Sequence, residues 1–343
     1  MSIISVRSLL AVSVVAGLSG VGGMAQAEAL TVYGKAHVSA DYINYTDSSD
    51  VAMGSNSSRI GFKGDKSLPH GLKVVWKFEN EIDLMAESKP LSARNRYVGL
   101  SHSAGTMIAG YHDTPFKTFG GKAGVFHDTI GERRGVLGAG NGSNKFNIRA
   151  RNSVMYISPK IAGLEVRAIG STGDDTDSSN DAGSMFGASA VYATKMLYAG
   201  VAYEDQTNLS ATEGTGLRVG AGAKFGTTSV NAMYEKLSST NVAKFDRAAY
   251  GGSVVHGVGP LALKAQVFLA DDYTGQADSG GMLYAVGADY SLDKSFKLYA
   301  VYAGVSNDAN SQIVLAGSGH GEKYTPAAGD SLSGISAGMV YKF

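Results

Sequence analysis

The feature that most constrains the fold is a period of two that recurs along almost the whole chain. Over residues 72–79, 217–225 and 261–269, apolar side chains stand at every second position, and mostly Lys, Arg, Gln, Gly or Ala stand between them. Successive side chains of a strand point to opposite faces, so each segment has one apolar face and one more polar face. A helical period of 3.6 residues fits none of these stretches. The pattern therefore predicts an all-β fold.

Sixteen such segments can be counted along the chain. They cover residues 30–42, 57–66, 72–83, 93–103, 106–113, 151–159, 164–172, 184–193, 196–205, 216–225, 228–238, 245–256, 261–271, 282–292, 296–305 and 331–343. Tight turns and long polar connections alternate between them, and the longest connection runs from 114 to about 150. Brief turns on one side and long loops on the other are typical of barrels that span the outer membrane.

The location of the charged residues favours a barrel in lipid. After residue 27, no apolar stretch approaches the ~18 residues of a membrane helix. A closed barrel is the other structure that satisfies every backbone polar group in lipid. A soluble sandwich or propeller is the alternative, but charged side chains recur on one face of nearly every segment, where such folds need apolar ones. We therefore predict a transmembrane 16-stranded antiparallel β-barrel.

Residues 1–27 have the features of a cleavable signal peptide. Arg7 gives a basic start, an apolar run follows over 9–18, and Ala25-Gln26-Ala27 is an A-x-A cleavage site. We expect one transmembrane barrel domain over 28–343, with a constriction loop at about 114–150. The formal net charge is zero, which gives no nucleic-acid footprint. Because the chain contains no Cys, disulfides and thiolate metal sites are impossible, and we expect no metal or cofactor.

Five stretches carry a family resemblance, in the same order along the chain. They are LTVYGKAHVSADY at 30–42, SSRIGFKGDKSLPHGLKVVWKFENEI at 57–82, RNRYVGL at 94–100, RNSVMYISPKIAGLEVRA at 151–168 and GISAGMVYKF at 334–343. Together they resemble the general, non-specific porin family of Gram-negative bacterial outer membranes. The resemblance implies a barrel, usually a homotrimer, through which small hydrophilic solutes and ions diffuse passively. It also implies that the third long loop, here 114–150, folds inward and narrows the channel.

Charges that line a pore are the groups through which it selects ions and solutes. Strand parity directs five basic side chains towards the lumen: Lys35, Arg59, Arg94, Arg96 and Arg151. The resemblance matches all of these except Arg96 to basic wall positions that face acidic residues on the inward loop. On the loop, Asp128 and Glu132 stand at i and i+4, which predicts one face of a short helix. Two arginines directly after Glu132 depart from the family pattern and would tilt the pore towards anions.

The aromatic residues on the apolar parity are predicted to anchor the barrel in lipid. Trp76, Tyr341 and Phe343 share this parity, so we expect them in the aromatic girdle. The segment that ends at Phe343 should pair along its length with the first strand, since an unpaired edge in lipid is costly. The resemblance adds that a C-terminal Phe on an alternating strand is a signal for the outer-membrane assembly machinery.

Three other functions remain open from the residues alone. A substrate-specific outer-membrane channel, for a sugar or a phosphorylated solute, would use a lumenal aromatic track or a basic site, and Tyr33, Tyr198 and Tyr299 keep this possibility open. An enzyme would need a nucleophile with a positioned base, yet the seven His residues have no recurring Ser or Asp spacing beside them. An adhesin or structural barrel would have a plugged lumen.

Overall fold

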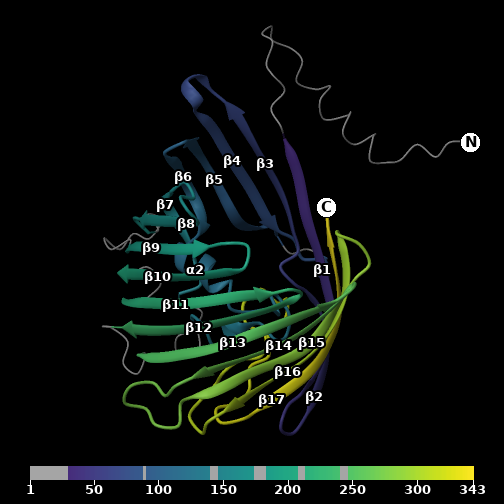
Figure 1. Cartoon of the computed structure of the whole chain (residues 1–343). Coiled ribbons are helices and arrows are strands. Elements are labelled where there is room, and N and C mark those ends of the chain that lie inside the picture. Colours follow the sequence, from purple (N-terminus) through teal and green to yellow (C-terminus); the bar gives the residue numbers. More distant parts are fainter. Residues whose placement is uncertain (1–29, 88–89, 140–145, 174–182, 208–212, 240–245) are drawn as a thin grey trace, which may run out of the picture.

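The computed structural model describes residues 30–87, 90–139, 146–173, 183–207, 213–239 and 246–343. The expected signal peptide, 1–27, lies outside these residues. Seventeen strands form one sheet (Figure 1). They are β1 (Thr31–Asn44), β2 (Ser49–Ser55), β3 (Arg59–Ser67), β4 (Lys73–Glu81), β5 (Ser92–His102), β6 (Gly105–Asp113), β7 (Arg149–Ile157), β8 (Leu164–Ser171), β9 (Ser184–Ala193), β10 (Leu197–Thr207), β11 (Gly214–Phe225), β12 (Thr228–Ser239), β13 (Arg247–Val258), β14 (Leu261–Ala270), β15 (Gly281–Ser291), β16 (Phe296–Asn307) and β17 (Leu332–Lys342).

The sheet closes on itself and makes sixteen barrel strands. β1 pairs antiparallel with β17, from Lys35 opposite Lys342 to Asn44 opposite Ser333. On its other edge β1 pairs first with β3 and then with β2. β2 and β3 are therefore two parts of one barrel strand, interrupted at 56–58, where Ser57 has a φ of +47°. The predicted closed antiparallel barrel is confirmed, whereas starting the second strand at residue 57 was wrong because 49–55 belongs to it.

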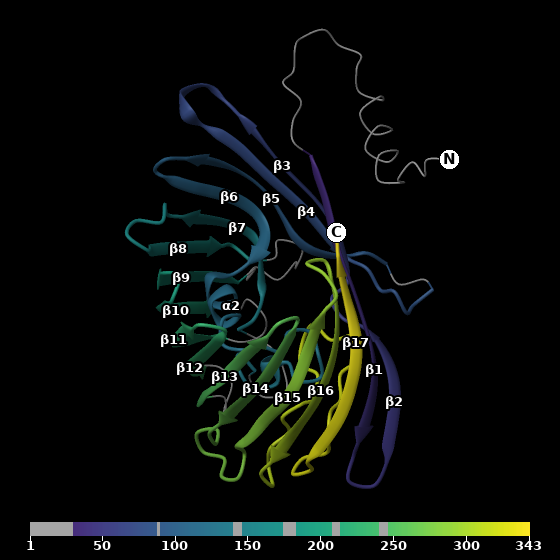
Figure 2. The same ribbon diagram turned by 45° about the vertical axis from the view of Figure 1, so that its right-hand side comes forward.

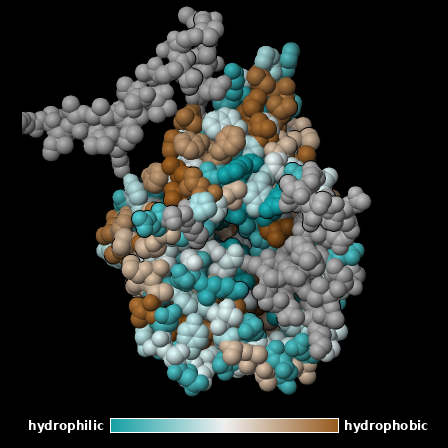
Figure 3. Space-filling view, turned by 180° about the vertical axis from the view of Figure 1, so that it is seen from behind, coloured by the Kyte–Doolittle hydropathy of each residue, from teal (hydrophilic) through white to brown (hydrophobic). Residues whose placement is uncertain are grey.

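The two faces of the strands differ as the period of two predicts. Exposed large apolar side chains fall on one parity, as at Val98 and Leu100 of β5 or Ile335 and Met339 of β17. The opposite parity is buried and often polar, as at Asp41 of β1. Figure 3 shows hydrophobic residues gathered over the upper part of the molecule, while hydrophilic residues dominate its lower end. An apolar exterior and a polar interior suit a barrel surrounded by lipid.

Short turns and long loops lie at opposite ends of the barrel. The 3-10 helix η1 (Pro69–Gly71) turns the chain between β3 and β4, and a two-residue connection joins β11 to β12. At the other end, long connections follow β6 and β16. The short helix α2 (Pro115–Gly120) and the 3-10 helix η2 (Arg133–Gly135) both belong to the connection after β6. Among the described residues, no helix is long and apolar enough to cross a membrane.

The end of the chain forms a seam with β1, as the alternating pattern predicts. Gly34 N donates to Phe343 O (3.0 Å), and Phe343 N donates to Gly34 O (3.3 Å). The Phe343 ring, 55% exposed, lies directly over Gly34, where any Cβ atom would overlap it. Gly34 is therefore the residue that lets an outward aromatic ring cover the seam.

Candidate pore constriction

The connection after β6 begins with a helix start that its residues specify. The Thr114 hydroxyl caps α2 by accepting from Lys117 N (3.2 Å). Pro115 occupies the first helical turn, where its missing N–H leaves no bond unmade. Figure 2 shows α2 inside the outline of the strands, beside β9 and β10. This local start therefore places the following residues along the inner wall.

Side chains of the inner wall satisfy the backbone of residues 114–139, here called the inner loop. Three such bonds come from β11, β13 and β14. They run from Arg218 Nη1 to Phe116 O (2.8 Å), from Ser253 Oγ to Ala123 O (2.6 Å) and from Gln266 Nε2 to Gly131 O (2.5 Å). A buried carbonyl left without a partner costs about 1–3 kcal/mol. The polar wall thus holds the backbone of the inner loop in one place.

Apolar side chains of the inner loop form the core of the molecule against the same wall. Phe116, Phe119, Ile130 and Leu137 are buried and belong to one cluster with inward residues of β14–β16 such as Phe268. Burying a large apolar side chain contributes roughly 1.5–3 kcal/mol. The inner loop is therefore packed against the wall like a protein core.

A fully buried ion pair lies beneath the start of the inner loop. Arg218 of β11 and Glu235 of β12 face each other in the sheet register and form a salt bridge, with side chains 0% and 1% exposed. The Arg218 guanidinium also lies 3.9 Å from the centroid of the Phe116 ring. Glu235 Oε1 accepts from Gly138 N (2.6 Å) at the far end of the inner loop. One pair therefore connects both ends of the loop to the wall.

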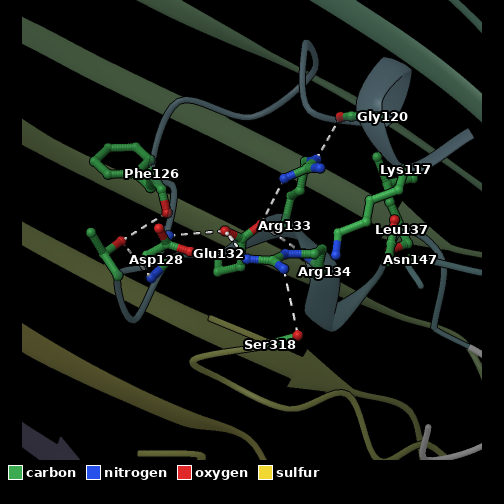
Figure 4. Close-up of polar contacts among 12 residues, drawn as sticks. Lys117, Gly120, Phe126, Asp128, Glu132, Arg133, Arg134, Leu137, Asn147 and Ser318 are labelled. Atoms are coloured by element: carbon green, nitrogen blue, oxygen red, sulfur yellow. Dashed lines mark hydrogen bonds and ion pairs between the residues drawn. The ribbon is translucent and has the colours of Figure 1, made fainter. Parts of the chain in front are cut away.

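Asp128, Glu132, Arg133 and Arg134 form a charged cluster on the inner loop (Figure 4), and Lys35 joins this cluster to β1. Lys35 Nζ of β1 lies 2.8 Å from Asp128 Oδ2. Arg134 Nη2 bonds both Asp128 Oδ1 (3.1 Å) and Glu132 Oε2 (3.0 Å), and Arg133 Nη1 bonds Glu132 Oε1 (2.7 Å). Charge-assisted bonds of this kind are the stronger class of hydrogen bond. Each loop carboxylate thus has at least two basic or backbone donors.

These contacts change the pKa values of the loop residues. Burial alone would raise the pKa of Glu132, but Arg134 and Arg133 outweigh it and lower the pKa to about 2. Burial likewise opposes ionisation of Asp128, yet Lys35 and Arg134 hold its pKa below the usual range. Burial lowers the pKa of Lys117 to about 8, although nearby Asp113 partly offsets it. The two acids of the cluster are therefore ionised at neutral pH.

The structure brings most of the predicted site residues together, on the inner side. Lys35 and Arg59 are paired directly across β1 and β3, and Arg94 bonds Glu79 Oε1 (2.9 Å) and Glu81 Oε2 (2.5 Å) of β4. Lys35 meets the predicted acid Asp128. The family pattern of basic residues at alternating positions was a sufficient signal for the inward orientation of Lys35 and Arg59, but it did not indicate their acidic partners.

Two of the predicted basic residues are placed differently. Arg96 pairs with the exposed Phe78 and bonds Asn80 of the outward parity, so the prediction that it lines the lumen is wrong. The reason is a bulge opposite Phe78–Asn80, which shifts the register of β5 between Arg94 and Arg96. Arg151 is exposed beside a second irregularity, where Asn152 has a φ of +43°, and the next buried wall position is Ser153.

The predicted helical face of Asp128 and Glu132 is also wrong. Asp128 has a φ of +57°, which no helix residue adopts, and η2 begins only after Glu132. Glu132 instead caps η2 and accepts from Asp128 N (2.9 Å). The two carboxylates are therefore neighbours through a turn and not through a helix.

Several residues of the site have no signal in a single sequence. Glu79 and Glu81, the partners of Arg94, and the pair of Arg218 with Glu235 come from strands whose alternation shows only that they face inward. A second case is Asp289 of β15, which binds Lys264 Nζ (2.8 Å) and Lys297 Nζ (2.6 Å). The register of the barrel strands decides which acidic and basic side chains meet, and the local sequence pattern does not specify that register.

The connection between β16 and β17, residues 308–331, lies against the inner loop. Ala316 N donates to Ile130 O (2.9 Å), and Ser318 bonds Arg134 (3.4 Å). On the other side, His320 Nε2 lies 3.1 Å from Asp41 Oδ2 of β1, with both side chains 0% exposed. The connection therefore joins the inner loop to β1 above the charged cluster.

Two of the cavities among the described residues lie between the inner loop and the wall. One, of about 210 Å³, lies among the charged cluster, β1, β3 and β14–β17. The other, of about 260 Å³, lies beneath α2 and is lined by Phe119 and Val191 with the basic Lys122, Lys160 and Arg167. The described residues contain no group of three or more His, Asp or Glu placed to hold a metal ion.

Comparisons with known proteins agree with this architecture. A family model described as Gram-negative porin matches residues 11–310. Outer membrane porin protein 32 of Delftia acidovorans is 27% identical over 98% of this chain and 99% of its own length. The major outer membrane protein P.IB of Neisseria gonorrhoeae is 30% identical, but the match spans only 36% of each chain.

Solved structures show the same fold. The anion-selective porin from Comamonas acidovorans superimposes with a TM-score of 0.79 at 22% identity, covering 92% of this chain and all of that one. The outer membrane protein OmpT of Vibrio cholerae, in its trimer form, has a TM-score of 0.68 at 18% identity, with 92% of this chain and 100% of that chain covered. With the closed barrel and the family match over most of its length, the chain belongs to the Gram-negative porins, the outer-membrane channels through which small solutes and ions diffuse passively.

Proposed function

We propose that the inner loop and its charged cluster form the constriction of this diffusion channel, and that the constriction favours anions. The observation that carries the proposal is the 2.8 Å bond between Lys35 and Asp128, which joins the inner loop to β1. The same loop is bound to β11, β13 and β14. A segment held on several parts of the wall narrows the water-filled path, and width and lining charge are what a pore uses to select.

The balance of charges on the inner loop supports the preference for anions. Residues 114–139 contain four basic residues, Lys117, Lys122, Arg133 and Arg134, against two acidic ones, so the loop carries 4 − 2 = +2. Both acids form ion pairs with basic side chains. The loop therefore presents no uncompensated carboxylate to a passing solute. The anion-selective porin of Comamonas acidovorans, which shares the fold, is consistent with this reading.

Zero-current potentials in a gradient of KCl across a planar bilayer test the proposal. The wild-type channel should show a potential of the sign that chloride preference produces. Arg94→Gln should reduce the chloride-to-potassium permeability ratio about twofold. The substitution removes one positive charge, whose effect on ions is screened by salt, and it leaves Glu79 and Glu81 without this basic partner. Arg96→Gln is the matched control, since it removes the same charge two residues away on the outward face.

The outcomes separate the parts of the proposal. Equal effects of the two substitutions would contradict the assignment of Arg94 to the conducting path. A wild-type potential of the opposite sign would contradict the preference for anions.

The substrate-specific alternative has less support. Each of its candidate aromatic residues is engaged in a local bond: Tyr33 with Glu79 (2.8 Å), Tyr198 with Lys122 O (3.2 Å) and Tyr299 with His37 (2.9 Å). They lie on β1, β10 and β16 and form no continuous track. An enzymatic role is not proposed, because the family and the fold are those of channels.

We further propose the remaining properties that the family resemblance implies. These are a cleaved signal peptide over 1–27, a homotrimer in the outer membrane, and recognition of the C-terminal strand by the outer-membrane assembly machinery. The Phe343 ring is exposed and lies 5.9 Å from the Tyr341 ring between centroids, which supports these proposed roles. Trp76 lies on the same outward parity and packs over Gly64.

A further inference from the structure

Two bulges at the long-loop end of the barrel leave basic side chains on its outer face. Arg96 of β5 lies directly opposite Phe78 of β4 and Tyr111 of β6. On β7, a second bulge sets Arg151 and Asn152 together against Tyr111. Residues directly opposite in a sheet point to the same face, and Phe78 is 52% exposed on the outward face. Arg96, Tyr111, Arg151 and Asn152 are here called the outer row.

The outer row stands at the depth of an aromatic girdle. The exposed rings of Phe186, Tyr203 and Tyr250 lie within four residues of the long-loop ends of their strands. Arg96 likewise lies four residues from the start of β5 at Ser92. Long loops of outer-membrane barrels are extracellular, and aromatic girdles mark the membrane interface. A charged side chain on the lipid face costs about 2–4 kcal/mol at the midplane and only ~0–1 kcal/mol near the interface. The outer row is therefore placed among the headgroups of the outer leaflet.

Nearby carboxylates are engaged on the opposite face of the sheet. Glu79 and Glu81 of β4 bind Arg94 at 2.9 and 2.5 Å. Arg96 instead bonds the neutral Asn80, and no carboxylate of the described residues forms an ion pair with it. A guanidinium group has five N–H donors. Arg96 therefore keeps donors for a ligand that comes from the membrane.

We propose that the outer row binds the phosphate group of an anionic glycolipid in the outer leaflet of the outer membrane. The planar fork of an arginine donates two parallel bonds to phosphate oxygens. Arg96 and Arg151 stand on the two strands that flank Tyr111, so both can reach one headgroup. Directly below them, Val98 and Val154 are 55% and 48% exposed and offer an apolar surface to the acyl chains. The inference depends on the outer-membrane location and not on the proposed preference for anions.

Native mass spectrometry of the channel, purified in a zwitterionic detergent, tests this inference. The probe is lipid A, an acylated disaccharide that carries two phosphates. The wild type should bind it about tenfold more tightly than the same lipid without its phosphates. Inorganic phosphate at the same concentration should not displace it. Arg96→Gln and Arg151→Gln should each raise the dissociation constant about fivefold, as expected for one lost charge contact that water partly screens. Arg96→Lys should restore only part of the affinity, because an ammonium group cannot donate the bidentate pair.

The matched control is Lys195→Gln, which removes an exposed positive charge from the turn between β9 and β10 at the opposite end of the barrel. Its dissociation constant should equal that of the wild type. Equal affinity of the wild type for the lipid with and without phosphates would overturn the inference, and this comparison needs no variant. Displacement by inorganic phosphate at the same concentration would overturn the assignment to a lipid. If Arg96→Gln changed the oligomeric state and left the lipid affinity unaltered, the row would contact a second copy of the chain, which would also overturn the inference.

Discussion

The substitution Glu132→Gln isolates the electrostatic attachment of the inner loop. Glu132 is 0% exposed and accepts from Arg133 Nη1, Arg134 Nη2 and Asp128 N at 2.7, 3.0 and 2.9 Å. Gln is nearly isosteric, so the change removes the charge and keeps the volume. It leaves the buried Arg133 guanidinium with the carbonyl of Gly120 (2.7 Å) as its remaining strong acceptor.

The magnitude follows from the pKa of the carboxyl group. Arg134 and Arg133 overcome the cost of burial and lower the pKa of Glu132 to about 2, whereas a free Glu has a pKa of about 4.3. At ~1.4 kcal/mol per pH unit, the ionised carboxylate contributes about 3 kcal/mol to holding the loop. The folded pKa is depressed, so this contribution is present above pH ~4 and is lost as the pH falls towards 2.

Open-channel noise and mean conductance in a planar bilayer report whether the inner loop stays attached. A loss of about 3 kcal/mol raises the population of detached loop roughly a hundredfold. At pH 7, the Glu132→Gln channel should therefore have a larger mean conductance and more open-channel noise than the wild type. The wild type should approach these values only below pH 4. The exposed Glu322 provides the control, because Glu322→Gln changes the same charge away from the cluster. A Glu132→Gln channel with wild-type noise and conductance at pH 7 would refute the reasoning.

Three further predictions concern stability and assembly. Arg218→Met should lower the free energy of unfolding by about 3–5 kcal/mol in urea, since it leaves the buried Glu235 without its partner. The double change Arg218→Met with Glu235→Leu should recover only part of the loss, because Phe116 O and Gly138 N also lose their buried partners. His320→Ala should make residues 308–331 susceptible to limited proteolysis, because it removes the buried contact to Asp41, worth about 1–3 kcal/mol; protection equal to that of the wild type would contradict this role. A polar extension after Phe343 should reduce the yield of folded barrel in the outer membrane, measured by heat-modifiable mobility, before it changes the conductance of the channels that do assemble.

The strand pattern was predictable because it is local. An apolar parity in each segment is needed wherever one face meets lipid, so every predicted segment overlaps a strand of the barrel. The interruption at 56–58 escaped prediction, since it is stabilised by contacts to another strand. Ser58 Oγ donates to His37 O (3.0 Å), and Asn56 N donates to the same carbonyl (2.8 Å).

Inward orientation was predictable only where the register is regular. Lys35 and Arg59 face the lumen as their parity indicates. Arg94 and Arg96 share one parity, but the bulge between them turns Arg94 inward and leaves Arg96 on the outward face. A bulge adds one residue to one strand and leaves no mark in the sequence that alternation alone would show. The exposed position of Arg151 escaped prediction for the same reason, because the backbone is irregular at the neighbouring Asn152.

The sequence by itself determined the barrel, its sixteen strands, the long segment after the fifth strand and the basic character of the early strands, because period, loop length and charge are properties of neighbouring residues. Only the tertiary structure decided which charges meet. The closure of β1 on β17 sets Lys342 beside Lys35, and the path of the inner loop brings Asp128 to the same lysine from 93 positions away. Such pairings depend on the register of the closed sheet and on the packing of the inner loop, and both arise only when the whole chain has folded.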